Sequence, residues 1–241
     1  MLAINARNAV PHYAIGNLAA HGDPIREGQD PLHAVGVERR YAANQTVFQE
    51  GEPNEHMFRV SRGVLKIFKT LGDGRRQVTG FLYPGDLIGL GAGVSYAYTA
   101  EAITETALVS CRRSKVEDLI NRSPAVARWL FSVASTELTA AQDQMLLLGR
   151  KTAVERVTSF LLNLAERAVL RGEDSDRIHV PMTRYDIADY LGVTTETVSR
   201  TITRLKALGL IRLCPNNCIH LVDADRLTEL SEDEGELSRT G

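Results

Sequence analysis

The sequence contains no apolar run near the roughly 20 residues that a membrane-spanning helix needs. Its first 21 residues are interrupted by Asn, Arg, Pro and His, so they lack the apolar segment of a secretory signal. It has only three cysteines, an odd and sparse set that excludes a disulfide framework and favours a reducing compartment. With 44% hydrophobic and 24% charged residues, the chain as a whole is not disordered. We therefore expect a soluble cytoplasmic protein with no membrane partner.

A large excess of charge of either sign is also missing, because the formal net charge is −2. The charge is unevenly placed, however: residues 223–241 carry a net charge of −5 and residues 1–222 carry +3. Between Thr194 and Cys214 there is one acid, Glu196, and the basic residues there are Arg200, Arg204, Lys206 and Arg212. A locally basic segment on a nearly neutral chain is typical of a focused site for an anionic partner. Residues 225–241 are expected to form an acidic tail.

The 241 residues are enough for two domains of ordinary size. Residues 1–35 show no sustained periodicity and predict an arm with at most one short helix. In residues 36–122, short apolar runs alternate with turn clusters such as Gly72-Asp73-Gly74, which is typical of an all-β sandwich or barrel. The sequence therefore predicts an α+β protein with an all-β domain over residues 36–122, a long helix over residues 123–149 and a further unit over residues 150–224.

The long helix begins with Ser123 as its N-cap and Pro124 at its first position. Val126, Trp129, Leu130 and Val133 make one apolar stripe near its start. A second set of residues follows the 4-3 spacing of a coiled-coil seam: Ala127, Phe131, Ala134, Leu138, Ala141, Met145 and Leu148. A helix with one stripe for its own domain and a second seam predicts a parallel homodimer, in which the small alanines allow close approach. The alternative is a helix buried on two sides within a monomer.

Residues 183–211 carry the spacing of a helix-turn-helix. A first helix, Arg184–Leu191, ends at Gly192, and a second one runs from Thr194 or Thr195 to about Ala207. Ala188 must be small because the second helix crosses over it, Gly192 must permit a left-handed turn, and Val198 fills the space between the helices. A helical hairpin of another kind does not need these three residues at these offsets.

The exposed face of the second helix carries the predicted chemistry. Arg200 can donate two hydrogen bonds to guanine, Glu196 can accept one from a cytosine or adenine amino group, and Ser199 lies between them. The alternative for the Glu196–Arg200 pair is a solvated ion pair of the kind common on helices. The two strands after the helix flank Pro215-Asn216-Asn217 and predict a wing that touches the DNA backbone. Further DNA and backbone contacts are assigned to Thr183, Thr194, Thr195, Thr203, Arg204, Asn216 and Asn217.

From about Glu38 to Val222, the order of all-β domain, long helix and winged helix-turn-helix resembles the CRP/FNR family of transcription regulators. The resemblance implies that residues 36–122 form a β-roll of the cyclic-nucleotide-binding type and that residues 150–224 form a winged helix-turn-helix DNA-binding domain. The resemblance is carried by GFLYPGDLIGL (80–90), AVERVTSFLLNLAER (153–167) and MTRYDIADYLGVTTETVSRTITRL (182–205), and it is greater to the FixK-like branch than to the cyclic-AMP-binding side. It implies that Glu196, Ser199 and Arg200 read a TTG…CAA-type palindrome, with Arg200 on the guanine. Thr201 departs mildly, because that position is usually apolar in the family. The resemblance also implies a homodimer that contacts RNA polymerase through the loop containing Gly72, Asp73, Gly74 and Arg75.

The resemblance further indicates which signals the protein does not sense. Tyr98-Thr99 stands where the cyclic-nucleotide-binding members have Arg-Ser, so the phosphate has no cationic partner. Residues 1–35 contain no cysteine, and Cys111 is one position away from the family's roll cysteine, so one chain cannot provide four thiolates for an iron–sulfur cluster. We therefore expect no cofactor and no metal. The FixK-like branch implies a regulator, in the main an activator, of microaerobic or anaerobic respiration or of nitrogen-oxide or nitrogen-fixation genes.

Three alternatives remain open at this point. Cys214 and Cys218 lie across the wing turn and could form a disulfide or respond to oxidants. A haem-based nitric-oxide sensor would need a histidine in the roll pocket, and the candidates are isolated: His12, His21, His33, His56, His179 and His220. A cupin-type metalloenzyme would need a His-x-His motif, but the roll offers only His56 near Glu50, Glu52 and Glu55.

Overall fold

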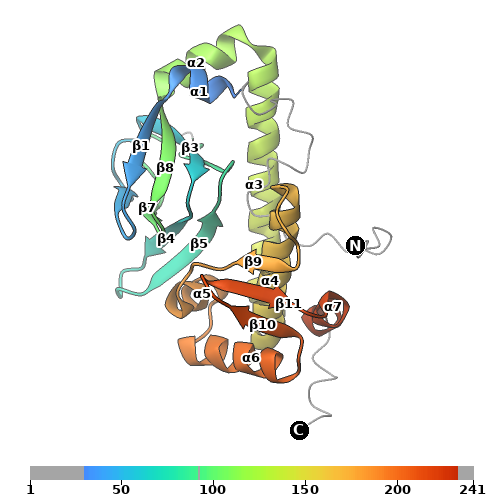
Figure 1. Cartoon of the computed structure of the whole chain (residues 1–241). Coiled ribbons are helices and arrows are strands. Elements are labelled where there is room, and N and C mark those ends of the chain that lie inside the picture. The colour runs from blue at the N-terminus through green and yellow to red at the C-terminus, as the bar shows by residue number, and fades with distance from the viewer. Residues whose placement is uncertain (1–29, 92, 233–241) are drawn as a thin grey trace.

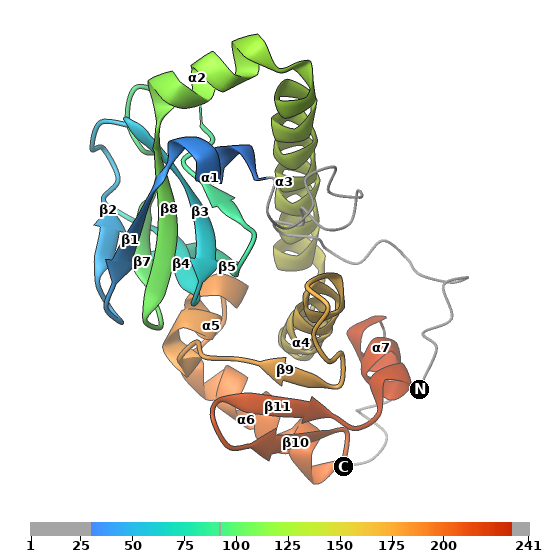
Figure 2. The same cartoon turned by 45° about the horizontal axis from the view of Figure 1, so that its top comes forward.

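The computed structural model describes residues 30–91 and 93–232. A β-roll lies beside one long helix, and a smaller helical unit with a three-stranded sheet lies at the far end of that helix (Figures 1 and 2). Most of the predicted arm, residues 1–29, and the end of the predicted tail, residues 233–241, lie outside the described residues.

The roll consists of two four-stranded antiparallel sheets, as the alternating runs predict. One has the order β1 (Val37–Tyr41), β8 (Thr106–Arg112), β3 (His56–Arg62) and β6 (Leu87–Ile88). The other has the order β2 (Thr46–Phe48), β7 (Thr99–Ala102), β4 (Leu65–Thr70) and β5 (Arg76–Leu82). Phe48, Leu65 and Leu108 are among the apolar side chains buried between them. Strand β1 contains no apolar run, because only Tyr41 of its five residues is buried.

Three helices connect the roll to the rest of the chain: α1 (Pro31–Val35), α2 (Arg113–Arg122) and α3 (Pro124–Arg150). The Ser123 side chain accepts a hydrogen bond from the Val126 N–H, and Pro124 occupies the first turn, so the predicted start of α3 is confirmed. The predicted first stripe of α3 is buried against α1, α2 and the roll. This packing fixes the N-terminal half of α3 to the roll domain.

The C-terminal unit begins with α4 (Ala153–Leu170). A capping box formed by Thr152 and Glu155 stabilises the start of this helix. The elements that follow are β9 (Arg177–His179), α5 (Arg184–Leu191), α6 (Thr195–Ala207), β10 (Ile211–Cys214), β11 (Cys218–Leu221) and α7 (Ala224–Glu232). Strands β10, β11 and β9 form an antiparallel sheet in that order, and the apolar faces of α4, α5 and α6 share one core with it.

Helix α7 differs from what the sequence predicted. Residues 225–241 were expected to be an acidic tail, but residues up to Glu232 form a helix that packs on α4. Leu227 and Leu230 are buried in the core of the C-terminal unit. A spacing of three puts these two leucines on one face of a helix. The acidic composition of residues 225–241 predicts a solvated tail, whereas the spacing of Leu227 and Leu230 predicts the short amphipathic helix that forms.

Candidate nucleic-acid interface

Helix α5 and the turn after it have the predicted local geometry. Thr183 caps α5: its hydroxyl accepts from the Asp186 N–H and donates to the Asp186 carboxylate. Gly192 ends the helix in the left-handed region, at φ +62°, and its N–H and that of Val193 both donate to the Ala188 carbonyl. A Cβ at Gly192 would meet other atoms only at ordinary contact distances, so the backbone conformation is what calls for glycine here.

Helix α6 packs on α5 as the spacing predicts. The Thr194 hydroxyl, rather than that of Thr195, caps the helix by accepting from the Thr197 N–H at 3.1 Å. Val198 is completely buried, and Ala188 beneath it is nearly so. Thr201 is also buried, beside Ile202, which places this polar departure from the family on the inner face. The three positions that define a helix-turn-helix therefore lie where the steric argument requires them.

The outer face of α6 is open to solvent at the end of the molecule remote from α2 (Figures 1 and 2). The side chains of Glu196 and Arg200 are 67% and 78% exposed and form an ion pair at 2.5 Å. Ser199, Thr203 and Arg204 are exposed on the same helix, and the Thr203 hydroxyl donates to the Ser199 carbonyl. These are hydrogen-bonding groups of the types that read bases and phosphates in a groove.

The wing is the β10–β11 hairpin, and its first strand contacts α6. Asn216 and Asn217 both have positive φ, 60° and 56°, a conformation that asparagine tolerates in tight hairpins. Cys214 and Cys218 are directly opposed in the β10–β11 register, and both thiols are free and half-buried. Burial and the neighbouring Cys214 raise the pKa of the Cys218 thiol. Redox sensing by this pair therefore stays an open alternative.

The predicted seam of α3 is largely uncovered in the single chain. Phe131, Leu138 and Met145 are 75%, 62% and 64% exposed, and Ala134 and Ala141 are exposed between them. Leu146, which the seam did not include, is exposed as well. Leu148 differs, because it is half-buried against the core of its own C-terminal unit. The exposed part of the predicted seam therefore ends at Met145, and Leu148 packs within its own chain.

Neutral groups occupy the two roll positions that the signal argument used: Tyr98 packs in the core between the sheets, and Cys111 lies on the face of β8 that packs on α1, α2 and α3. The Tyr98 hydroxyl accepts from the Gly89 N–H, and its ring lies against Phe48. Burial raises the pKa of Tyr98, so this side chain stays uncharged. The Cys111 thiol donates to the Leu32 carbonyl, and burial together with Asp30 raises its pKa to about 11. Neither residue supplies the cation or the thiolate of a ligand-binding relative.

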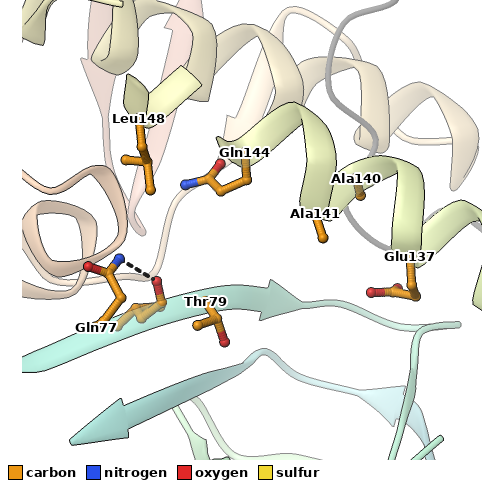
Figure 3. A pocket seen from close by; sticks show the side chains of 8 residues that line it. Gln77, Thr79, Glu137, Ala140, Ala141, Gln144 and Leu148 are labelled. Carbon is orange, nitrogen blue, oxygen red and sulfur yellow. Dashed lines mark hydrogen bonds between the residues drawn. The ribbon is translucent and has the colours of Figure 1, made fainter. Parts of the chain in front are cut away.

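A pocket of about 220 Å³ opens between β5 and α3 (Figure 3). It is lined by Gln77, Val78, Thr79, Glu137, Ala140, Ala141, Gln144 and Leu148. Burial, with a smaller contribution from the charge of Asp86, raises the pKa of Glu137 to about 7. The Glu137 carboxyl is therefore poised to change protonation near neutral pH.

The loop between β4 and β5 is a short exposed turn. Asp73 accepts from the Arg75 N–H at 3.0 Å and forms an ion pair with its guanidinium at 2.7 Å, and Gly74 has positive φ. The positive charge of Arg75 is therefore paired with Asp73 within the same turn.

Known proteins match both halves of the chain. A family model described as a cyclic nucleotide-binding domain matches residues 38–123, and one described as a Crp-like helix-turn-helix domain matches residues 155–230. The nitrogen fixation regulation protein FixK of Azorhizobium caulinodans is 41% identical over 82% of this chain and 80% of its own length. The protein of the same name from Rhizobium meliloti is 36% identical, with coverage of 84% and 91%. The chain is a FixK-like member of the CRP/FNR family.

A solved structure agrees with this FixK-like assignment. That of FixK2 from Bradyrhizobium japonicum has a TM-score of 0.77 with this chain at 39% identity, and the match covers 83% of this chain and 98% of that one. The expected order of roll, long helix and helix-turn-helix is thereby confirmed.

Membership of this family makes the FixK-like chain a DNA-binding transcription regulator and not an enzyme, because its relatives are regulators. The metalloenzyme alternative is thus set aside. Within residues 30–91 and 93–232, no three His, Cys, Asp or Glu side chains gather in a way that could hold a metal ion. Over the same residues, every helix is too short or too polar to span a bilayer.

Proposed function

We propose that this FixK-like regulator binds a TTG…CAA-type palindrome as a homodimer and reads each half-site with Glu196, Ser199 and Arg200. The observation that carries the proposal is the exposed Glu196–Arg200 pair on the outer face of α6, the second helix of the helix-turn-helix. In that fold the second helix enters the major groove with its N-terminal residues at the base edges. Glu196 lies in the first turn of α6 and Arg200 one turn later.

The pairing of these two side chains supports base reading. The Glu196 carboxylate holds one edge of the Arg200 guanidinium, which limits its rotation before any DNA is present. A guanidinium that is already oriented can donate two parallel hydrogen bonds to O6 and N7 of guanine. The other carboxylate lone pairs are then free to accept from an amino group on a neighbouring base.

The exposed seam of α3 supports the dimer. Phe131, Leu138 and Met145 recur at heptad spacing on one helix, and leaving three large apolar side chains in water is unfavourable. Two copies joined along α3 in parallel would give two α6 helices related by twofold symmetry. Such a dimer matches a palindrome whose half-sites are about 34 Å apart.

The remaining parts of the function rest on the relatives. The name of the FixK proteins refers to regulation of nitrogen fixation, and we propose that this chain regulates genes of that kind or of low-oxygen respiration, in the cytoplasm where it meets the chromosome. We also assign the exposed turn with Gly72, Asp73, Gly74 and Arg75 to a contact with RNA polymerase. Thr183, Thr194, Thr195, Asn216 and Asn217 are assigned to the DNA backbone.

Selection of duplex DNA from a random pool by the purified protein tests the proposal. We expect recovery of a palindrome with TTG in one half and CAA in the other. A selected sequence without twofold symmetry would contradict the dimer, and a palindrome without these triplets would contradict the assigned base contacts. Arg226→Ala provides a matched control for later variants, because Arg226 is exposed on α7, away from α6.

A further inference from the structure

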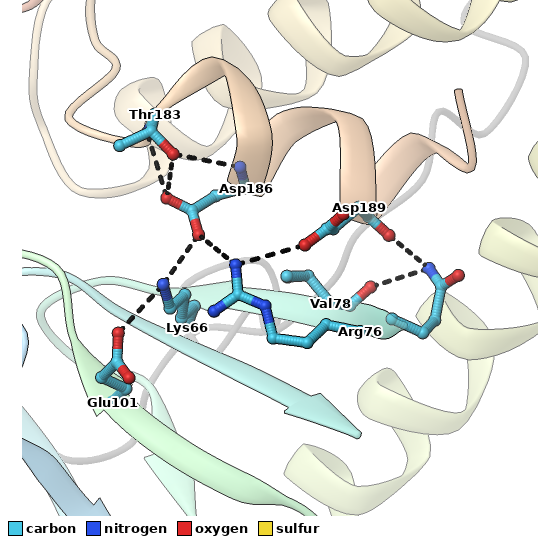
Figure 4. Close-up of polar contacts among 8 residues, drawn as sticks. Lys66, Arg76, Val78, Glu101, Thr183, Asp186 and Asp189 are labelled. Atoms are coloured by element: carbon cyan, nitrogen blue, oxygen red, sulfur yellow. Dashed lines mark hydrogen bonds and ion pairs between the residues drawn. The ribbon is translucent and has the colours of Figure 1, made fainter. Parts of the chain in front are cut away.

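A cluster of charged side chains connects the roll to the first helix of the helix-turn-helix (Figure 4). The Lys66 ammonium on β4 lies 2.7 Å from the Asp186 carboxylate on α5 and 3.0 Å from the Glu101 carboxylate on β7. The Lys66 and Asp186 side chains are only 7% and 5% exposed. These two residues are 120 positions apart in the chain, so the pair exists only when both domains are folded and in contact.

Neighbouring residues of β5 extend this contact along α5. The Arg76 guanidinium lies 3.3 Å from the Asp189 carboxylate and 3.8 Å from that of Asp186. The Gln77 amide donates to the Asp189 carbonyl at 2.7 Å. Two successive turns of α5 are therefore held by β4 and β5.

Asp186 has a second task in the same helix. Its other carboxylate oxygen accepts from the Thr183 N–H and hydroxyl, so one side chain both starts α5 and binds the roll. Although burial opposes ionisation, hydrogen bonds from Lys66 and Thr183 outweigh it and lower the pKa of Asp186. The carboxylate therefore stays charged and paired at neutral pH.

A second buried pair holds the other side of the C-terminal unit. Arg167 of α4 donates to the Phe81 carbonyl and pairs with the Asp86 carboxylate, and its guanidinium lies over the Tyr83 ring. Contacts on α4 and on α5 together oppose rotation of the unit about either one. Because Ala188 and Gly192 fix α6 to α5, the direction of α6 relative to α3 depends on these contacts.

A buried ion pair contributes little net stability, because removing its two charges from water costs free energy. Apolar residues of similar size often give a protein that is equally stable or more stable. The charges of the pair instead favour one arrangement, because any other leaves a buried charge without a partner. We propose that Lys66 and Asp186 are positioning residues: through them the roll itself sets the orientation of α6, and so the half-site spacing that the dimer accepts. This inference rests on the proposed function.

The test compares binding to two duplexes by fluorescence anisotropy: the selected palindrome, and the same half-sites moved about two base pairs further apart. That insertion rotates one half-site by about 70° relative to the other. The wild-type protein should prefer the original spacing by at least about tenfold. In Lys66→Met/Asp186→Asn, which removes both charges together, the preference should fall to about threefold or less, while affinity for a single half-site changes less than about threefold.

Two further variants separate positioning from folding. Lys66→Arg keeps the charge and should keep the spacing preference. Arg76→Gln removes the half-exposed ion pair between Arg76 and Asp189, so it should leave the melting temperature unchanged and still weaken the spacing preference. If the double variant does not fold, Arg76→Gln provides the test of whether contacts between the roll and α5 set the spacing. A full spacing preference in the folded double variant, or in Arg76→Gln when the double variant does not fold, would overturn the inference. Wild-type protein that binds neither duplex nor the half-site would instead overturn the proposed function itself.

Discussion

The Glu196 carboxylate and the Arg200 guanidinium lie 2.5 Å apart on successive turns of α6, and both side chains are exposed. An exposed pair of this kind contributes little to stability, because water screens it and two long side chains lose rotational freedom. Under the proposed function, the ion pair instead fixes the direction of the Arg200 guanidinium. We therefore expect substitutions of this pair to change DNA reading without changing folding.

Glu196→Gln tests this expectation. The amide keeps the shape of the side chain but holds the guanidinium less strongly and accepts fewer hydrogen bonds. We expect discrimination at the base pair that Glu196 contacts to fall by about 1–3 kcal/mol, and the stability to change by less than about 0.5 kcal/mol. Competition binding with single-base variants of the selected site measures the first, and thermal melting the second. Glu229→Gln on α7 is the control, and equal specificity in both variants would contradict base contact by Glu196.

Leu138→Glu tests the dimer seam. In a parallel dimer the two new carboxylates would lie close together in an apolar interface, where an unpaired charge is costly. We expect sedimentation velocity to show a monomer at concentrations where the wild-type protein is a dimer. Gln142→Glu adds the same charge at an exposed position next to the seam and should leave the dimer intact. A dimeric Leu138→Glu protein would mean that the copies associate elsewhere.

Glu137→Gln tests the buried carboxyl of the pocket. Because the pKa of Glu137 rises from 4.5 to about 7 on folding, the folded state binds this proton more tightly than the unfolded state. The resulting stability is fully present below about pH 4.5 and is lost as the pH rises towards 7. Glu137→Gln should therefore increase the free energy of unfolding at pH 8 by about 1–3 kcal/mol and flatten its pH dependence.

Urea unfolding at several pH values measures this effect of Glu137. The control is Glu117→Gln, at an exposed position of α2. Parallel pH profiles for the wild-type protein and Glu137→Gln would show that this carboxyl is not the group that titrates.

The wing cysteines are expected to resist mild oxidation. A disulfide would form by loss of two thiol protons and two electrons to hydrogen peroxide, which becomes two waters. The raised pKa of Cys218 leaves little of the reactive thiolate at neutral pH. We therefore expect thiol titration after brief treatment with peroxide to find all three thiols. Loss of two thiols together with DNA binding, prevented by Cys214→Ser, would establish a redox-sensing wing.

Local patterns of the sequence predicted the parts of the structure that local rules govern. The left-handed Gly192, the buried Val198 and the start of α3 at Ser123 each depend on a few neighbouring residues. Their prediction needed only helix periodicity and capping. The roll was predicted as a class of structure from the turn clusters.

The parts that depend on distant contacts were not predictable in the same way. Leu148 fits the heptad seam, yet it packs on its own C-terminal unit, which lies there only because of how the domains dock. Nothing near Lys66 in the sequence indicates a partner 120 residues away. The DNA-backbone assignment of Thr183 stays a prediction, and the sequence did not indicate that its hydroxyl also donates to the Asp186 carboxylate. The signal in the sequence is the position of Lys66 between apolar residues of a predicted strand, because a charge that becomes buried there requires a partner.

The most direct test of the account is the affinity of Arg200→Ala for the selected palindrome and for the same site with its guanines replaced by adenines. The wild-type protein should prefer the guanine site by about 1–3 kcal/mol per half-site. Arg200→Ala should stay dimeric, bind both sites equally and bind them weakly, while Arg226→Ala should behave like the wild type. An Arg200→Ala protein that keeps the full preference for guanine would show that α6 does not read the bases.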